Sequence, residues 1–436
     1  MNLKNEIINK IGSSDIGKRI LKGAFWSFTG TALAKLIVLL GGILCARILG
    51  KVEYGEFGMI RSTISMFVAL GTVGLGLTAT KYISEYRECN KSRISSIFIL
   101  TSVFSVITGI LVTFIILLLA PYLAEKSLHA PYLINEIRFG AILLFFTVID
   151  AVQTGILAGF EDFRSIAINT FISNVGEVIL MLIAAYFYNV IGAIIGFGLG
   201  YVILFFLNIN SIKKNIQRDR LQIEMKSISM QDLGILYRFS IPATLSSLMV
   251  APAFWFVRSL LVRQGGFSEM GLYEVADQWK IIILFIPSAI SQIVLPILSN
   301  IVGKKDSDSF WNVLKYNIYL NVVVSFVLVM FVVLASNYIL EFYGTEFSDN
   351  RPIIILAFST IFTSISCVVG LAISSKAKMW IGFFFNAFWA CMLIMFSYIF
   401  LHNDLGAVGL SLAVLCSYMI HALLQFMYLY FIVRIK

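Results

Sequence analysis

The stretch RILGKVEYG at positions 47–55 recurs in outline as RQGGFSEMG at positions 263–271. Arg, Gly, Glu and Gly occupy the same places of the pattern R-x-x-G-x-x-E-x-G in both copies, which lie 216 residues apart in a chain of 436. A motif that returns after about half the chain indicates two halves built on one plan. Each copy is flanked by apolar runs, so the motif predicts an equivalent turn in each half.

The composition is that of a membrane protein. Hydrophobic residues make up 59% of the chain and charged residues 13%, whereas a soluble domain carries about 25% charged residues. The net charge of +9 would suggest a nucleic-acid partner in a soluble protein. Here the excess of Lys and Arg is explained by their distribution between the two sides of a membrane, and no nucleic-acid partner is expected.

Apolar runs long enough to cross a bilayer occur along the whole chain. A helical crossing needs about 20 mostly apolar residues. About twelve runs qualify: roughly 24–49, 56–79, 96–121, 139–160, 166–188, 190–209, 236–262, 275–299, 316–340, 352–373, 379–401 and 406–433. Lipid offers the backbone no hydrogen-bond partner, so each run is expected to be an α-helix. The sequence therefore predicts an all-α membrane protein with about 12 transmembrane helices in two six-helix bundles.

The basic residues predict the orientation. If the N-terminus is cytoplasmic, 23 of the 33 Lys and Arg residues fall on the cytoplasmic side, as the positive-inside rule requires. Both termini are then cytoplasmic, and both motif copies face outward. Six is an even number, so the halves share one orientation and form a parallel repeat. We expect an N-terminal six-helix bundle at 1–209, a cytoplasmic linker at 210–235 and a C-terminal six-helix bundle at 236–436.

The repeat also pairs two residues that can bend a helix. The same offset places Gly71 opposite Pro287, at similar depths in the second and eighth predicted helices. Gly and Pro weaken or kink a helix, and neighbouring helices can satisfy the freed backbone groups. Static kinking for packing is one interpretation. The other is a hinge at Gly71 and Pro287 in a transporter that rocks.

Charged residues inside the apolar runs are the most informative for function. Lys35, Asp150 and Glu177 lie near the middle of the first, fourth and fifth runs. Three further cations lie nearer the outer side: Arg61, Arg258 and Lys280. Charges at these depths are costly and usually face an interior cavity. One water-filled cavity between the halves would account for them together. Alternatively, the first three neutralise one another, and Arg258 and Lys280 extend toward the interface.

No catalytic or metal-binding pattern is present. The five cysteines show neither metal nor redox spacing. The segment GSSDIGKR at 12–19 approaches a phosphate-binding loop, but Arg19 stands where that loop needs Ser or Thr, and no strand precedes it. We therefore expect no enzyme activity, no metal and no cofactor beyond coupling to H⁺ or Na⁺, for which a buried carboxylate is a candidate site.

Two long segments resemble a known family. LKGAFWSFTGTALAKLIVLLGGILCARILGKVEYGEFGMIRS at 21–62 resembles the opening of the polysaccharide transport family, the O-antigen and capsule-type flippases of the MOP superfamily. MGLYEVADQWKIIILFIPSAISQIVLPILS at 270–299 is similar to the start of that family's second half. Chain length, number of apolar runs and the two-half organisation agree with the family over essentially the whole chain.

The resemblance implies a flippase that turns an isoprenoid-diphosphate-linked oligosaccharide from the cytoplasmic to the outer leaflet. The implied mechanism is alternating access, coupled to an ion gradient, in a prokaryotic cytoplasmic membrane. A polysaccharide polymerase and glycosyltransferases are implied partners. Family members are thought to use a cationic lumen, which we assign to Lys35, Arg61 and Arg258 as binding residues for the diphosphate. Asp150 or Glu177 is the candidate residue for ion coupling.

Other functions fit parts of the sequence. A Na⁺ or H⁺ antiporter of the related multidrug family would use Asp150 and Glu177, although the intramembrane cations disfavour cationic drugs. A lipid II flippase is a further alternative, and about twelve spans rather than fourteen counts against it. A membrane-embedded glycosyltransferase or ligase would be expected to carry a large outer loop or paired carboxylates at a membrane face, and neither is seen.

Overall fold

The structure, a computed structural model, describes residues 15–72, 74–89, 91–221, 249–303, 307–376 and 379–433. Every regular element within these ranges is helical, as predicted. The first half contains α2 (Asp15–Thr72), α3 (Leu75–Cys89), α4 (Lys91–Tyr122), η1 (Leu123–Ser127), η2 (Pro131–Leu133), α5 (Ile134–Gly159) and α6 (Phe163–Arg218). The second half contains α9 (Val250–Gly303), α10 (Ser307–Tyr343), α11 (Arg351–Ser375), α12 (Met379–His402), α13 (Gly406–Met427) and η5 (Tyr428–Val433).

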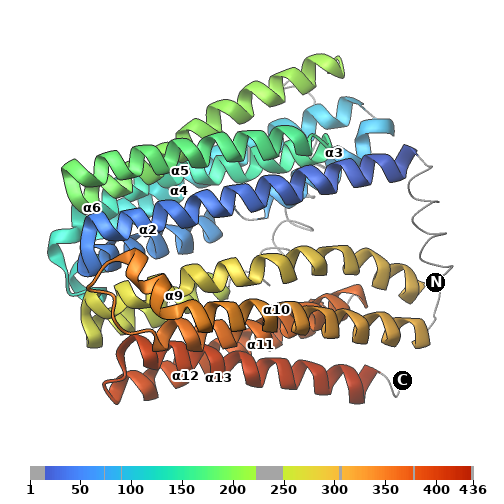
Figure 1. The fold of residues 1–436 in the computed structure, drawn as a ribbon. Helices are drawn as coiled ribbons and strands as arrows, with labels where there is room; N and C mark the ends of the chain where they lie inside the picture. The colour runs from blue at the N-terminus through green and yellow to red at the C-terminus, as the bar shows by residue number, and fades with distance from the viewer. Residues whose placement is uncertain are drawn as a thin grey trace.

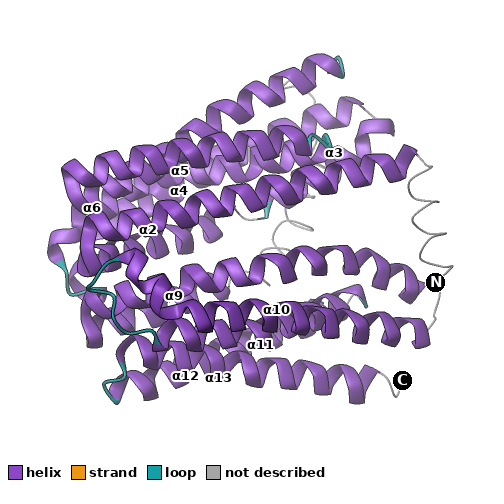
Figure 2. Cartoon of the chain, in the orientation of Figure 1, coloured by secondary structure: helices purple, strands orange, loops and turns teal. Residues whose placement is uncertain are grey.

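The helices form two bundles that lie side by side. In Figure 1 the first bundle runs from blue to green and the second from yellow to red, and Figure 2 shows that the described connections between the helices, drawn in teal, are short. Helices α2 and α9 lie along the boundary and pack against each other. The beginning of α2 and the end of α13 lie at the same end of the molecule, opposite the end where the bundles meet (Figure 1).

The repeated motif forms an equivalent corner in each bundle. Helix α2 is interrupted at Gly50, with φ 75° and ψ 174°, and α9 at Gly266, with φ 77° and ψ 178°. This backbone conformation is accessible essentially only to glycine. The two glycines are 216 residues apart, like the motif copies. The predicted recurrence of one turn in both halves is therefore confirmed, and its cause is the shared backbone requirement.

The last glycine of each motif copy brings the two corners into contact. A Cβ atom on Gly55 would collide with the carbonyl oxygen of Phe267, and one on Gly271 with the carbonyl oxygen of Lys51. Glycine at these positions lets the backbones of the two bundles touch directly. The motif thus specifies both the corner and the contact between corners.

Each corner is also held by a loop of the other bundle. The amide of Lys51 donates a hydrogen bond to Glu346, at 2.9 Å, in the loop after α10. In return, Arg263 Nε donates to the carbonyl oxygen of Ser127, at 2.9 Å, and Arg263 Nη2 donates to that of Lys126. These reciprocal bonds fasten the two bundles together at the corner end.

The second predicted span is not one continuous helix. The run predicted at 56–79 is divided between the end of α2 at Thr72 and the start of α3 at Leu75, with Gly74 at φ 62°. Glycine-rich sequence resists helix formation, and α3 gains close packing because Gly76 sits directly on the backbone of α5. In contrast, α9 has helical backbone angles through Pro287, since its interruption lies at Gly266.

Helix α6 contains the predicted tight join and extends past a predicted boundary. Its backbone leaves helical geometry at Tyr188 and Asn189, where the sequence predicted a join. Gly196 then packs directly on the backbone of the preceding segment at Met181. The helix continues to Arg218 rather than ending near residue 209. Residues 222–235 of the predicted linker and 236–248 of the span predicted at 236–262 lie outside the described residues.

The surface and helix lengths are those of a multi-pass membrane protein. Within the described ranges, eight helices are long and apolar enough to cross a membrane. Two of them, Phe28–Thr72 and Phe163–Arg218, are interrupted near the middle. Large apolar side chains such as Leu118 and Leu334 are exposed on the outside of the bundles. An exposed apolar surface of this kind needs lipid rather than water around it.

Candidate functional site

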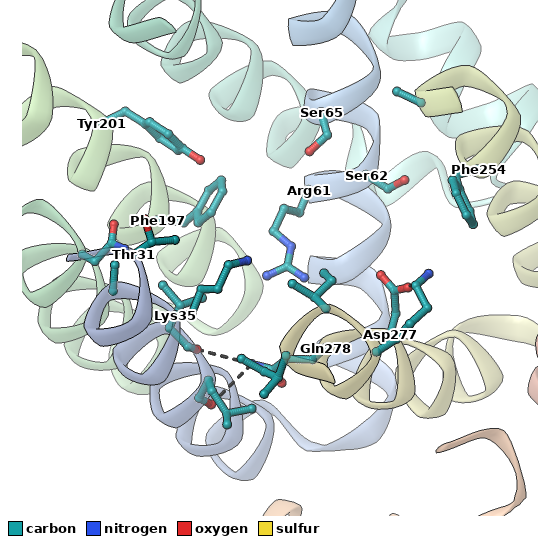
Figure 3. A pocket seen from close by; sticks show the side chains of 18 of the residues that line it. Thr31, Lys35, Arg61, Ser62, Ser65, Phe197, Tyr201, Phe254, Asp277 and Gln278 are labelled. Carbon is teal, nitrogen blue, oxygen red and sulfur yellow. Dashed lines mark hydrogen bonds and ion pairs between the residues drawn. The ribbon is translucent and has the colours of Figure 1, made fainter. Parts of the chain in front are cut away.

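A cavity of about 590 Å³ lies between the bundles. Its walls come from α2 and α6 of the first bundle and from α9 of the second (Figure 3). Among the described residues, five charged side chains line it: Lys35, Arg61, Arg258, Asp277 and Lys280. The cavity therefore brings together all four intramembrane cations that the sequence analysis singled out, three of which had been assigned to the diphosphate.

Lys35 and Arg61 extend into the cavity from two segments of α2. Figure 3 shows both side chains directed toward its centre, with Thr31 one helical turn before Lys35. The Lys35 ammonium lies 5.9 Å from the centroid of the Phe285 ring on α9. Among the described residues, no carboxylate lies within ion-pair distance of that ammonium. Lys35 is therefore a cation offered to the cavity without a competing carboxylate in the described part of the chain.

The other three cations belong to a buried ion-pair network. Arg61 of the first bundle pairs with Glu274 of the second. Arg258 Nη2 lies 2.6 Å from Asp277, and its Nη1 lies 3.7 Å from Glu274. Lys280 Nζ lies 2.5 Å from the other oxygen of Asp277. Because the carboxylates are buried, each carries its negative charge at low cost only while its cationic partners stay beside it.

Glu274 and Asp277 are charged residues of the site that the sequence analysis did not single out. Glu274 directly precedes the span predicted at 275–299, and Asp277 lies near its start. In the structure, α9 resumes directly after Gly266, so both residues lie several residues inside the helix. A signal was present in the spacing, because positions 274, 277 and 280 fall on one helical face. Acid, acid and base on one face of an apolar helix indicate an internal ion-pair network.

The charged groups leave the cavity electropositive. Among the described residues, the four cations Lys35, Arg61, Arg258 and Lys280 face two carboxylates, Glu274 and Asp277, so these six groups carry a net charge of +2 when all are ionised. In a site shielded from bulk water, this excess attracts anions more strongly than it would at an exposed surface. A doubly charged anion would balance it.

Gln278 joins the bundles at the corner side of the cavity. Its amide nitrogen donates to the carbonyl oxygens of Val38 and Leu39, at 3.3 Å each, as the dashed lines in Figure 3 indicate. Its amide oxygen accepts from the Tyr343 hydroxyl at 2.8 Å. The side chain fits against Gly42, where any Cβ atom would collide with it. This contact separates the cavity from the motif corners.

The two carboxylates proposed for ion coupling do not line this cavity. Asp150 is 3% exposed, and neither of its carboxylate oxygens hydrogen-bonds to a described residue. Glu177 is buried against Gly200, next to Tyr201 of the cavity wall. Within the described residues, neither carboxylate forms an ion pair with Lys35. The neutralising cluster considered from sequence is therefore not formed, and both residues lie behind the wall, inside the first bundle.

Solved structures with the same fold are membrane transporters. An inward-facing multidrug resistance MATE family transporter of the MOP superfamily superposes with a TM-score of 0.79 at 20% identity, covering 91% of this chain and 93% of that one. A MOP superfamily transporter from Pyrococcus furiosus, described as having a binding pocket of reversed polarity, gives 0.72 at 18% identity, with 94% of each chain covered. The protein therefore has the multi-pass fold of the MOP superfamily.

The family is given by the sequence match. Residues 20–302 match the polysaccharide biosynthesis protein family, and the chain belongs to that family. The EPS I polysaccharide export inner membrane protein EpsE of Ralstonia solanacearum is 25% identical over 193 residues, 43% of this chain and 44% of EpsE. An uncharacterised membrane protein of Methanocaldococcus jannaschii is 28% identical over 109 residues, 25% of this chain and 22% of the relative. The matched segments span less than half the length of these relatives.

Proposed function

We propose that the protein flips an isoprenoid-diphosphate-linked oligosaccharide from the cytoplasmic to the outer leaflet of a prokaryotic cytoplasmic membrane, for cell-surface polysaccharide synthesis. The observation that carries the proposal is the cavity with two uncompensated positive charges, in a chain of the polysaccharide biosynthesis family. A diphosphate supplies two or more negative charges and suits Lys and Arg donors. The name of the relative EpsE, a polysaccharide export protein of an inner membrane, supports the same kind of function.

The cavity residues are given distinct roles in this proposal. Lys35, which has no carboxylate partner in the described ranges, makes the first contact with the diphosphate. Arg61 and Arg258 bind it next, by exchanging a carboxylate oxygen for a phosphate oxygen. In this exchange the arginines keep an anionic partner throughout, and Asp277 remains paired with Lys280. Glu274 and Asp277 hold the guanidinium groups in place before the substrate arrives and reclaim them when it leaves.

Reconstituted transport tests the function directly. Purified protein in liposomes should make a fluorescent polyprenyl diphosphate sugar accessible to a membrane-impermeant quencher faster than protein-free liposomes do. The same liposomes should not accumulate a lipophilic cation such as ethidium. Accumulation of ethidium without lipid flipping would replace the proposal by the second candidate, a multidrug antiporter, which the buried Asp150 and Glu177 favour. Lipid II supplied as a competitor tests the further alternative, a lipid II flippase. Strong inhibition of flipping of the fluorescent lipid by lipid II would favour that alternative.

We propose about twelve crossings in two halves, 1–209 and 236–436, joined by a cytoplasmic linker at 210–235. The proposal is supported by the equivalent corners at one end of the molecule and by the beginning of α2 and the end of α13 at the other (Figure 1). The motif corners would face outward and both termini inward. A polysaccharide polymerase and glycosyltransferases would act on the lipid at the outer and inner faces, respectively.

The topology predicts two labelling patterns. After replacement of the five native cysteines, His129→Cys should react with a membrane-impermeant maleimide in intact cells, whereas Arg220→Cys should react only after permeabilisation. Both side chains are exposed, so burial does not limit labelling. The reason for the orientation is the cytoplasmic excess of Lys and Arg. Labelling of Arg220→Cys from outside would invert the proposed orientation.

Alternating access would require the corner contacts to open. In the structure the bundles are fastened at the corner end by Lys51, Glu346 and Arg263, and the cavity lies beyond Gln278 toward the other end. This arrangement supports an inward-open state in the proposed orientation. The outward-open state would break these bonds and bring the inner ends of α2 and α9 together.

The hinge proposal concerns Gly71 and Pro287. Gly71 lies beside the interruption between Thr72 and Leu75, which supports flexing in the first bundle. Gly71→Ala would place a Cβ atom 2.9 Å from a methyl group of Val148 and remove a flexible residue. We expect Gly71→Ala and Pro287→Ala to slow transport at normal protein levels, in the liposome assay. Wild-type rates in both variants would remove these residues from the mechanism.

Ion coupling is proposed for Asp150 or Glu177. A buried carboxylate without a hydrogen-bond partner among the described residues can bind H⁺ or Na⁺. Asp150→Asn or Glu177→Gln should make the transport rate independent of an imposed proton or Na⁺ gradient. Transport is measured in liposomes with each gradient separately, and Glu85→Gln, an exposed carboxylate of α3, serves as the control. Retention of gradient dependence in both variants would exclude these carboxylates from coupling.

A further inference from the structure

The charges of the cavity are not spread evenly over its walls. Asp277, Arg258 and Lys280 lie on α9, and Lys35 and Arg61 extend from α2 toward the centre. Among the described residues, the remaining wall carries no Asp, Glu, Lys, Arg or His. We define the neutral wall by its polar and aromatic members: Ser65, Thr170, Asn174, Phe197 and Tyr201. In Figure 3, Phe197 and Tyr201 lie on the side opposite Asp277.

The neutral wall presents a fixed aromatic surface. Phe197 and Tyr201 are one turn apart on α6, with ring centroids 5.3 Å apart and planes at 81°. Phe197 also packs edge-on against the fully buried Phe57, at 6.0 Å. These contacts hold the Phe197 ring in place and leave Tyr201 partly exposed to the cavity. Because Tyr201 is only partly buried and lines the cavity, part of its surface is available to a ligand.

The neutral wall also carries hydrogen-bonding side chains. Thr170 and Asn174 are one turn apart on α6, and Ser65 lines the same cavity from α2. Together with the Tyr201 hydroxyl, the wall offers an amide and three hydroxyls, each able to donate and accept. Such groups recognise a neutral, hydroxyl-rich ligand and fix its orientation.

We propose that the neutral wall binds the sugar residue attached to the diphosphate and that Tyr201 determines which sugar is accepted. The inference rests on the proposed function and specifies where the two chemically different parts of its substrate lie. A pyranose has an apolar C–H face that packs on an aromatic ring, and hydroxyls at its edge that bond to amides and hydroxyls. When the diphosphate is bound to Lys35 and Arg61, the first sugar reaches the adjacent neutral wall. The sugar then does not compete with the diphosphate for the cationic side chains.

The test compares a bare polyprenyl diphosphate with three sugar-bearing forms of the same lipid. Dissociation constants are measured in nanodiscs for a polyprenyl diphosphate and for the same lipid carrying one glucose, galactose or N-acetylglucosamine. We expect at least one sugar-bearing lipid to bind the native protein about tenfold more tightly than the bare lipid. Tyr201→Ala should abolish that difference and leave the affinity for the bare lipid unchanged. Tyr201→Phe, which keeps the ring, should retain part of the difference and alter the order of preference among the sugars.

Control variants separate this inference from the proposed function. Lys35→Ala should weaken binding of both lipids alike. Phe206→Leu changes an aromatic side chain of the same helix that is 62% exposed and outside the cavity, and should leave both affinities unchanged. Equal affinity of the native protein for bare and all sugar-bearing lipids would overturn the inference alone, as would equal losses for both lipids in Tyr201→Ala. Failure of the native protein to bind either lipid would overturn the proposed function and the inference with it.

Discussion

Replacement of Lys35 by alanine is expected to reduce flipping by a factor of about 10 to 150 while the protein remains folded. Lys35 is the cavity cation that has no carboxylate partner among the described residues, so its removal leaves no unpaired acid behind. A charge-assisted hydrogen bond shielded from water is worth about 1.5–3 kcal/mol, or roughly a factor of 10 to 150. The measurement is the initial flipping rate in liposomes, normalised to the amount of reconstituted protein.

Two variants control the Lys35 experiment. Lys35→Arg keeps the charge but changes its shape and reach, and should retain part of the activity. Lys214→Ala removes an exposed lysine of α6 that does not line the cavity, and should transport normally. Full activity of Lys35→Ala at normal protein levels would exclude Lys35 from substrate binding and leave the cavity without its proposed first contact.

Replacement of Arg61 by alanine is expected to destabilise the protein as well as to stop transport. Glu274, which is 1% exposed, would lose its partner from the other bundle. Loss of one partner of a buried ion pair costs about 3–5 kcal/mol. We expect a value near 3 kcal/mol, because Arg258 stays 3.7 Å from Glu274. The effect is measured as a lower midpoint of thermal unfolding in detergent.

The double variant Arg61→Ala/Glu274→Gln separates stability from function. Removal of the acid together with its partner should restore much of the unfolding temperature, because no unpaired charge remains in the interior. Transport should stay low, since the arginine that receives the diphosphate is still missing. An unchanged unfolding temperature in Arg61→Ala would contradict the role of the pair in joining the bundles. Recovery of transport in the double variant would show that Arg61 acts only on Glu274.

Some predictions succeeded because they depend on local chemistry. Long apolar runs had to be helices in lipid, whatever their neighbours. Gly50 and Gly266 were paired from four matching letters, and the structure gives them the same backbone angles. The cost of placing Lys35, Arg61 and Arg258 in apolar runs also pointed to an internal cavity, and the structure places all three in one cavity.

Other features could not be predicted because they depend on which residues meet across the two bundles. The partners Arg61 and Glu274 are separated by 213 residues, and no local periodicity relates them. The division between Thr72 and Leu75 depends on how closely α3 approaches α5 through Gly76. The sequence predicted buried charge, but not that it would be a network of alternating signs.

The sequence by itself determined the helices, the twofold repeat, the glycine corners and the presence of costly internal charges, because lipid and backbone sterics act on each segment separately. Only the tertiary structure decided which charges share a cavity and which are paired. In the structure, Lys35 lies in the cavity without a described acid beside it, and Arg61 forms an ion pair with Glu274. Asp150 and Glu177 are buried and do not line the cavity. The physical reason is that an ion pair forms only at distances of a few ångströms, and those distances are set by how the two bundles pack.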